Sequence, residues 1–496
     1  MSVGPGGGPD FATLLAQVRG LREEVARHAA ARLEGWRPWL LRQEFADSAV
    51  NLAHYLALRE RDLAPLQREL SRLGLSSLGR SERRVMPALD AIVATLARLA
   101  GEAAAYPDER AMLTGETALA RRTAEMLGPD PGGPYTRIMV TLPSEAAGEP
   151  RLLKDTIAAG ADCFRINCAH DGPDAWEAMI RNVRDAAAKA GRGCPVLMDV
   201  GGPKCRITEA AGEKKPRLFR GSRLVLRREI AGGPSGGIVA TTNVPEVLAA
   251  LEVGDEVWID DGKAGARVVS TAPDTAELEV FICRAKGVRL KPGKGVNFPD
   301  SELTLPPLTA KDLKDLDFVA GHADLVGFSF VQRPEDIFWL QRELKARRPD
   351  EALPGLVLKI ETRLAIRNLP DLIVAGAGRQ PLAVMLARGD LAVELGFERL
   401  SEIQEEILWI CEAAQVPVIW ATQVLEGLVR DGSPSRAEAT DAAMAQRAEC
   451  VMLNKGPFIV EGVRFLDNVL RRMDRHQSKK TARLGPLGSW RTPEAA

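Results

Sequence analysis

The sequence predicts an α/β protein: a (β/α)8 TIM-type barrel with an inserted all-β lid domain and an N-terminal all-α domain. Eight short aliphatic or β-branched runs follow residue 136, and amphipathic helical segments separate most of them, as parallel β/α units require. We favour a closed barrel over an open sheet because closure removes exposed strand edges. A long interruption by shorter, alternating runs predicts the inserted domain.

The part of the chain before the first strand is predicted to be helical, from residue 11 to about residue 127. Apolar residues between Leu14 and Val25 recur at helical spacing. The segment GPDPGGP at 128–134 is a strong breaker of regular structure. We therefore assign residues 1–130 to a helical domain whose role the sequence does not reveal.

The predicted strands define the remaining domains. They are RIMVTL (137–142), DCFRIN (162–167), PVLMDV (195–200), DLVGFSF (324–330), GLVLKIE (355–361), LAVMLAR (382–388), VPVIWAT (416–422) and ECVMLN (449–454). The barrel is expected to comprise residues 131–206 and 299–478. Residues 207–298, with alternating strands and Gly-rich turns, are the predicted lid, and residues 479–496 are a polar tail.

Composition limits the classes of partner. A net charge of -1 over 496 residues gives no electrostatic argument for nucleic acid or an anionic membrane. The seven cysteines are scattered and lack C-x-x-C spacing, so neither a zinc site nor a disulfide framework is indicated. The start of the chain has no signal-peptide pattern, and no apolar run is long enough to cross a bilayer. We expect a soluble, cytoplasmic protein.

Polar and charged residues follow the predicted strands where a barrel places its active site, at the carboxyl ends. These residues are Arg165, Asn167, Asp199, Ser329, Lys359, Glu361, Asp390 and Thr422. Lys359 and Glu361 are two positions apart on one strand, so their side chains face the same way. The sequence therefore predicts one shared, charged mouth.

Two chemistries fit the residues at this mouth. Glu361 and Asp390 supply hard carboxylate oxygens, which suit Mg²⁺ (or Mn²⁺) better than Zn²⁺. Arg165 and Lys359 suit a phosphorylated carboxylate. The alternative for the carboxylates is an ordinary ion-pair network with Lys359 and Arg388.

Together these groups indicate phosphoryl transfer or metal-assisted enolate chemistry, both of which need developing oxygen charge to be neutralised. The absence of G-x-x-x-x-G-K-[ST] excludes a P-loop enzyme. Thr422 closes its strand, where it either positions a water or relays a proton, or only caps the next helix.

The chain from about residue 136 to residue 472 resembles the pyruvate kinase family. The segments that carry the resemblance occur in the family's order: TRIMVTLP, AGADCFRINCAHDG, MDVGGPKCRI, VGDEVWIDDG, KGVNFPDSELTLPPLTAKD, LKIETRLAIRNL, MLARGDLAVELG and IWATQVLEGLVRDGSPSRAEATDAA. The resemblance implies Mg²⁺-dependent transfer of the phosphoryl group of phosphoenolpyruvate to ADP, giving pyruvate and ATP.

The resemblance also implies residue roles. Substrate binding falls to Arg165, Ser329, Lys359, Ala387, Arg388, Gly389, Asp390 and Thr422. Of these, Lys359 stabilises the phosphoryl group in flight, Arg165 contacts the phosphate, and Thr422 lies on the route that protonates the enolate. Glu361 and Asp390 are the implied metal ligands. The implied nucleotide side comprises Thr141, Pro143, Asn167, His170, Arg206 and Lys294.

One departure from the family concerns its monovalent-cation site. Asn167 and Asp199 remain, but Ala169 and Val200 replace the family's hydroxyl residues. In the same loop Lys204 replaces the family's Glu, which makes the resemblance one to the potassium-independent branch. We therefore expect Lys204, with the remnant Asn167 and Asp199, to substitute for K⁺, so that K⁺ is not required.

Other departures leave alternatives open. Asn454 occupies the position of the family's proton-relay serine, the family's C-terminal regulatory domain has no counterpart, and the N-terminal helices are additional. One alternative is a Mg-dependent aldol-type lyase that acts on pyruvate enolate. Another is a degenerate kinase barrel that serves as a regulatory binding protein. The predicted lid favours the kinase, and a homo-oligomer is expected.

Overall fold

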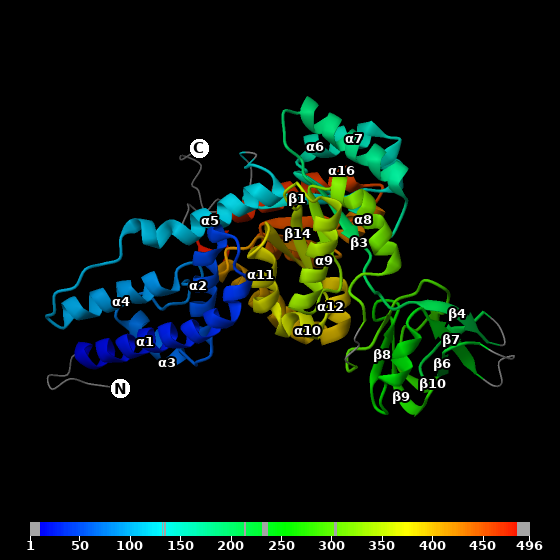
Figure 1. Cartoon of the computed structure of the whole chain (residues 1–496), viewed down its shortest axis with the longest axis horizontal. Helices are drawn as coiled ribbons and strands as arrows, with labels where there is room; N and C mark the ends of the chain where they lie inside the picture. Colours follow the sequence, from blue (N-terminus) through cyan, green and yellow to red (C-terminus); the bar gives the residue numbers. More distant parts are fainter. Residues whose placement is uncertain are drawn as a thin grey trace, which may run out of the picture.

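The computed structural model describes residues 10–130, 132, 135–212, 215–230, 237–301 and 305–483. Figure 1 shows the N-terminal helices at one end, the β-rich part at the other, and the barrel between them. Most of the predicted polar tail, residues 484–496, lies outside the described residues.

The predicted helical region is confirmed. Its helices are α1 (Phe11–Trp36), α2 (Gln43–Arg59), α3 (Ala64–Arg72), α4 (Val85–Leu99) and α5 (Glu109–Leu127). The Asp10 side chain caps α1 by accepting a hydrogen bond from the Thr13 N–H at 3.0 Å, and Asp108 caps α5 in the same way. None of the helices in the described part of the chain is long and apolar enough to span a membrane.

Eight parallel strands form a closed barrel, as predicted. They are β1 (Arg137–Thr141), β2 (Cys163–Asn167), β3 (Val196–Val200), β13 (Leu325–Phe328), β14 (Gly355–Ile360), β15 (Leu382–Ala387), β16 (Val418–Ala421) and β17 (Cys450–Leu453). Pairing of β1 with β17 closes the ring. The continuous burial of these strands explains their nearly unbroken apolar sequences.

Helices surround the barrel, and three short ones lie near its mouth. The longer helices are α6 (Pro150–Ala159), α7 (Pro173–Lys189), α8 (Ala310–His322), α9 (Pro334–Arg347), α11 (Leu369–Ala377), α13 (Phe397–Ala413), α15 (Arg436–Ala445) and α16 (Ile459–Asp474). The short helices that follow strands β14, β15 and β16 are α10 (Arg363–Arg367), α12 (Arg388–Leu395) and α14 (Glu426–Asp431).

The insertion between β3 and β13 folds as the predicted lid. A seven-stranded sheet runs in the order β12-β8-β9-β10-β6-β7-β4. Its strands are β4 (Ile207–Ala211), β6 (Arg223–Arg227), β7 (Ile238–Thr242), β8 (Glu256–Ile259), β9 (Ala264–Ala272), β10 (Thr275–Cys283) and β12 (Val296–Asn297). The lid has its own apolar core, which includes Leu224, Ala266 and Leu278.

The end of α5 closes the floor of the barrel. Met126 and Leu127 are buried and belong to the same apolar cluster as residues inside the barrel, such as Val357 and Ile419. Gly355, the first residue of β14, lies against this plug, because a Cβ added there would be 2.8 Å from the Met126 sulfur. The N-terminal helices are therefore continuous with the barrel's interior packing.

A buried arginine adds a polar link between the helices and the barrel. Arg122 of α5 donates to the Ser48 Oγ at 2.8 Å and to the Glu44 carbonyl at 2.8 Å on α2. It also reaches the carbonyls of Ala414 (3.2 Å) and Gln415 (3.1 Å) after α13. Burial lowers the pKa of Arg122 to about 10. The division into domains at the boundaries given above stays a prediction.

Candidate active site

A cavity of about 740 Å³ lies at the carboxyl ends of the barrel strands, against the lid. Its lining includes Arg165, Lys359, Glu361, Met385, Ala387, Arg388, Gly389, Asp390, Thr422 and Asn454 from the barrel, and Glu256, Trp258, Asp261 and Gly262 from the lid. The structure thus brings together most of the residues that the sequence placed at one mouth.

Lys359 lies at the centre of the charged groups. Its Nζ is 2.7 Å from the Ser329 Oγ, 3.2 Å from the Glu361 Oε1 and 3.3 Å from the Asp199 Oδ2. Burial alone would lower the pKa of Lys359, but Asp199 and Glu361 outweigh it and raise the pKa above its ordinary value. Lys359 is therefore a fixed ammonium in the cavity wall.

Asp199 links both cations of the cavity. The Arg165 guanidinium donates to its Oδ2 from Nε (2.8 Å) and Nη2 (2.5 Å), and Nη1 reaches the Thr141 Oγ at 3.3 Å. Burial would raise the pKa of Asp199, but Lys359 and Arg165 together bring it below its ordinary value. Sequence analysis missed this role, because it grouped Asp199 with the monovalent-cation residues.

Glu361 is held by a strained loop. Its Oε2 accepts a hydrogen bond from the Phe330 N–H at 2.7 Å, and Phe330 has a left-handed backbone with φ 55°. Burial raises the pKa of Glu361, and the negative charge of Asp390 adds to the effect. Two carboxylates that repel each other in a buried site are a suitable environment for a divalent cation.

Lys204 forms an ion pair with Asp390. Its Nζ lies 2.7 Å and 3.0 Å from the two oxygens of Asp390, and 3.7 Å from the Asp261 Oδ1 of the lid. Among the described contacts it makes none with Asn167 or Asp199. The role of Lys204, with Asn167 and Asp199, as a substitute for the monovalent cation stays a prediction.

The backbone path explains where Lys204 points. Gly202 turns the chain after β3 with φ +67°. Gly295, on the segment that returns from the lid, leaves room for the lysine, since a Cβ there would lie 3.0 Å from the Lys204 Cε. Asp199 is already paired with Arg165 and Lys359. The ammonium consequently pairs with Asp390, which also accepts from the Asn297 amide at 3.4 Å.

Arg388 fastens the end of β16. Its guanidinium donates to the Asp441 carboxylate at 2.5 Å and 2.8 Å, and to the carbonyls of Ala421 (2.9 Å) and Thr422 (2.8 Å). Within the described residues, Arg388 thus pairs with Asp441, and Asp390 pairs with Lys204. No sequence signal pointed to Asp441, because it lies 53 positions from Arg388.

Thr422 and Gly389, which both line the cavity, approach each other closely. Thr422 has φ +74°, and a Cβ added to Gly389 would lie 2.8 Å from the Thr422 Cγ2. Gly389 lies in the first turn of α12, whose N-cap, Ala387, makes no side-chain capping bond. The free N–H groups of this turn are suited to bind an anion.

The predicted nucleotide residues are not among the described residues that line this cavity. They are Thr141, Pro143, Asn167, His170, Arg206 and Lys294. Arg206 and Lys294 lie on the two chain segments that connect the lid to the barrel. Arg206 donates to the Gly293 carbonyl at 2.9 Å, and Lys294 pairs with Asp260 of the lid at 2.7 Å.

Comparison with known proteins places this geometry in a family. A family model described as "Pyruvate kinase, barrel domain" matches residues 134–458, which include the lid. The chain belongs to the pyruvate kinase family. A pyruvate kinase of Agrobacterium vitis is 33% identical over 341 residues, covering 67% of this chain and 68% of that protein.

Two further pyruvate kinases show how widely the similarity extends. That of Methylorubrum extorquens is 33% identical over 347 residues, covering 68% of this chain and 69% of that protein. The human protein, "Pyruvate kinase PKLR", is 30% identical over 352 residues, covering 68% of this chain and 59% of that protein. Pyruvate kinases are phosphotransferases that require a divalent metal.

The residues present fit such a metal. Glu361 and Asp390 line one cavity and supply carboxylate oxygens, the ligands that Mg²⁺ prefers. The described residues contain no cluster of three or more His, Cys, Asp or Glu side chains able to hold a metal. Two protein carboxylates leave positions for water and substrate, as is usual for Mg²⁺ and unusual for a structural zinc site.

Proposed function

We propose that this protein transfers the phosphoryl group of phosphoenolpyruvate to ADP, giving pyruvate and ATP. The observation that carries the proposal is the cavity itself, where Lys359 and Arg165, two carboxylates and the N-terminus of α12 converge beneath a lid. An aldol-type lyase has no nucleotide to enclose, so the lid favours the kinase. The filled positions of Lys359, Glu361, Asp390 and Thr422 argue against a degenerate barrel.

Different groups of the cavity bind the phosphate and the carboxylate of the substrate. The substrate phosphate lies against Lys359 and Arg165, and its carboxylate binds the N–H groups of Gly389 and Asp390 at the start of α12. As the bond from phosphorus to the enol oxygen breaks, a bond forms to a β-phosphate oxygen of ADP. The fixed Lys359 ammonium neutralises the charge that develops on the phosphoryl oxygens.

The enolate that remains takes up a proton on its terminal carbon. Thr422 lines the cavity, and its side chain is proposed to hold the last position of the proton route. Asn454, at the end of β17, also lines the cavity but carries no hydroxyl. We propose that the amide makes this protonation slower than a serine would, without affecting the phosphoryl step.

Glu361 and Asp390 are the proposed ligands of Mg²⁺ or Mn²⁺. When bound, the ion supplies Lewis-acid neutralisation of the phosphate charge. Ser329 orients Lys359, since it accepts from the ammonium and donates to the Val200 carbonyl at 2.7 Å. The nucleotide residues, including Arg206 and Lys294, are proposed from the family resemblance. Cytoplasmic location and homo-oligomer formation stay predictions.

The direct test is an assay of pyruvate formation by the purified protein from phosphoenolpyruvate and ADP. We expect turnover with Mg²⁺ and none after chelation. Formation of pyruvate without ADP would indicate a different reaction. No pyruvate under any of these conditions would favour the degenerate-barrel alternative.

Replacing Gly389 with Ala is expected to lower kcat/KM by about 10- to 100-fold, because the new methyl would displace Thr422. The turn cannot easily relax, since Arg388 holds the Thr422 carbonyl. The clash involves the Thr422 methyl, so Thr422→Ser, which keeps the hydroxyl, should restore most of the activity in the double variant. If Thr422→Ser alone is active and the double variant is not rescued, the loss in Gly389→Ala does not come from the clash with the Thr422 methyl.

The reaction rate should be nearly the same in Na⁺, K⁺ or a bulky organic cation. Ala169 and Val200 lack the hydroxyls of the family's usual potassium site, and Lys204 already brings an ammonium to Asp390. Lys204→Glu should depress activity, since it places a second carboxylate beside Asp390. The measurement is initial rate against KCl at constant ionic strength. A steep, saturable rise with K⁺ would refute the expectation.

A further inference from the structure

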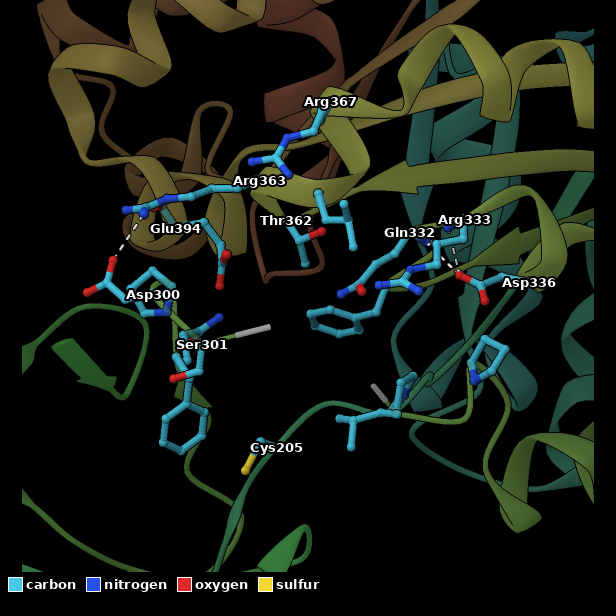
Figure 2. Close-up of a pocket in the computed structure, with 18 of the residues that line it drawn as sticks. Cys205, Asp300, Ser301, Gln332, Arg333, Asp336, Thr362, Arg363, Arg367 and Glu394 are labelled. Carbon is cyan, nitrogen blue, oxygen red and sulfur yellow. Dashed lines mark hydrogen bonds and ion pairs between the residues drawn. The ribbon is translucent and has the colours of Figure 1, made fainter. Parts of the chain in front are cut away.

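A second cavity, of about 360 Å³, lies where the segment returning from the lid meets the barrel loops after β13 and β14 (Figure 2). It is separated from the active site by two residues whose polar groups face the catalytic side. The Asn297 amide donates to Asp390, and the Phe330 N–H donates to Glu361. The second cavity is thus adjacent to the catalytic groups, and it shares one lining residue, Arg363, with the active-site cavity.

One side of this cavity has a buried hydrogen-bond acceptor without a donor. Asn297 is 7% exposed, and its Oδ1 has no hydrogen-bond partner within the described structure. The neighbouring Glu394 of α12 is also buried, and burial raises its pKa to about 7. The Arg363 N–H and the Asn297 amide donate to Glu394, whereas the Asn297 Oδ1 is a buried acceptor that is costly unless a donor reaches it. An ammonium group would donate to the Asn297 Oδ1 and lie beside the Glu394 carboxylate.

The other side of the cavity carries one arginine, Arg333, and one carboxylate, Asp336. Figure 2 shows Glu394 and Asp300 on one side, and Arg333 and Asp336 on the other. The Asp336 carboxylate is satisfied by the backbone N–H groups of Gln332 and Arg333, both at 2.9 Å. The Arg333 guanidinium forms no ion pair with any residue that the structure describes. It is therefore placed to receive a carboxylate.

Arg363 and Asp300, two further charged residues of the lining, pair with each other, and several other lining residues are apolar. Arg363 donates to the Asp300 carboxylate at 3.1 Å and to the Glu394 carbonyl at 2.6 Å. Phe298, Phe330 and Leu364 are among the apolar residues of the lining. A short hydrocarbon chain would pack against these side chains.

We infer that this cavity binds a small zwitterion whose ammonium and carboxylate are separated by a short carbon chain. The ammonium binds the Asn297 Oδ1 and the Glu394 carboxylate, the carboxylate binds Arg333, and the chain packs on Phe298 and Phe330. Binding at this site is independent of the proposed reaction, so its test does not depend on catalytic activity.

The test is calorimetric titration of the full-length protein with 5-aminopentanoate, pentanoate and pentylamine. The three molecules share a carbon chain and differ in their charged ends. We expect saturable binding of 5-aminopentanoate, with each single-charge analogue about tenfold weaker or more, because each loses one charge-assisted contact. Absence of saturable binding at millimolar 5-aminopentanoate, or equal binding of either analogue, would overturn the inference.

Two variants locate the site. Leu364→Trp should fill the cavity and abolish binding, whereas the same change at the half-exposed Leu99, in α4, should not affect it. Arg333 is exposed, so Arg333→Gln is expected to fold normally. This substitution should lower the affinity for 5-aminopentanoate about tenfold and leave the affinity for pentylamine unchanged. An unchanged affinity for 5-aminopentanoate in Arg333→Gln would show that the carboxylate does not bind there.

Discussion

Lys359→Met is expected to reduce kcat by about 10²- to 10³-fold, the usual effect of losing one preorganised electrostatic donor. Lys359 is buried, and contacts with Ser329, Glu361 and Asp199 fix the position of its charge. Methionine keeps the length and apolar stem of the side chain and removes only the ammonium. The measurement is steady-state kcat, with circular dichroism to verify the fold.

The control for this variant is Lys154→Met, an exposed lysine on α6, which should leave kcat unchanged. Lys359→Met also leaves Asp199 and Glu361 with one cation fewer, so a lower melting temperature is expected alongside the catalytic loss. Turnover within a few-fold of the unmodified protein would remove Lys359 from the mechanism.

Glu361→Gln and Asp390→Asn are each expected to raise the Mg²⁺ concentration for half-maximal activity by about 100-fold. Loss of a residue that only supports a metal ligand already costs about 10- to 100-fold, and here the ligand itself loses its charge. Each amide keeps the side-chain volume. Glutamine at 361 also keeps an oxygen for the Phe330 N–H.

Nucleotide affinity is measured in the same two variants. Loss of a metal ligand should change this affinity much less than the Mg²⁺ requirement, whereas a general disturbance of the site would change both. Asp174→Asn, at an exposed position in the first turn of α7, is a matched control and should leave the Mg²⁺ titration unchanged. Unchanged Mg²⁺ titrations in both Glu361→Gln and Asp390→Asn would favour the ion-pair interpretation of these carboxylates.

The strands and their shared mouth were predictable because both depend on local sequence. A parallel strand covered on both faces has a continuous apolar run, and residues two positions apart on a strand share a face. These two rules were sufficient to locate β14 and to place Lys359 beside Glu361. The residue roles came instead from the family resemblance.

Long-range pairing was not predictable from these rules. Lys204 and Asp390 are 186 positions apart, and their contact depends on how the lid returns past Gly295. We had grouped Lys204 with Asn167 and Asp199 on the family resemblance, and that resemblance gave no sign of the contact with Asp390. The partnership of Arg388 with Asp441 was missed because the two residues are 53 positions apart in the sequence.

The plug formed by Met126 and Leu127 has a consequence for how the chain is made. Met126 and Leu127 are synthesised before every strand of the barrel, so the plug has already been made when β1 emerges from the ribosome. Because the plug and the strands share one apolar layer, the helices and the barrel are expected to unfold as one cooperative unit. A barrel excised after residue 130 would present the open end of that layer to water.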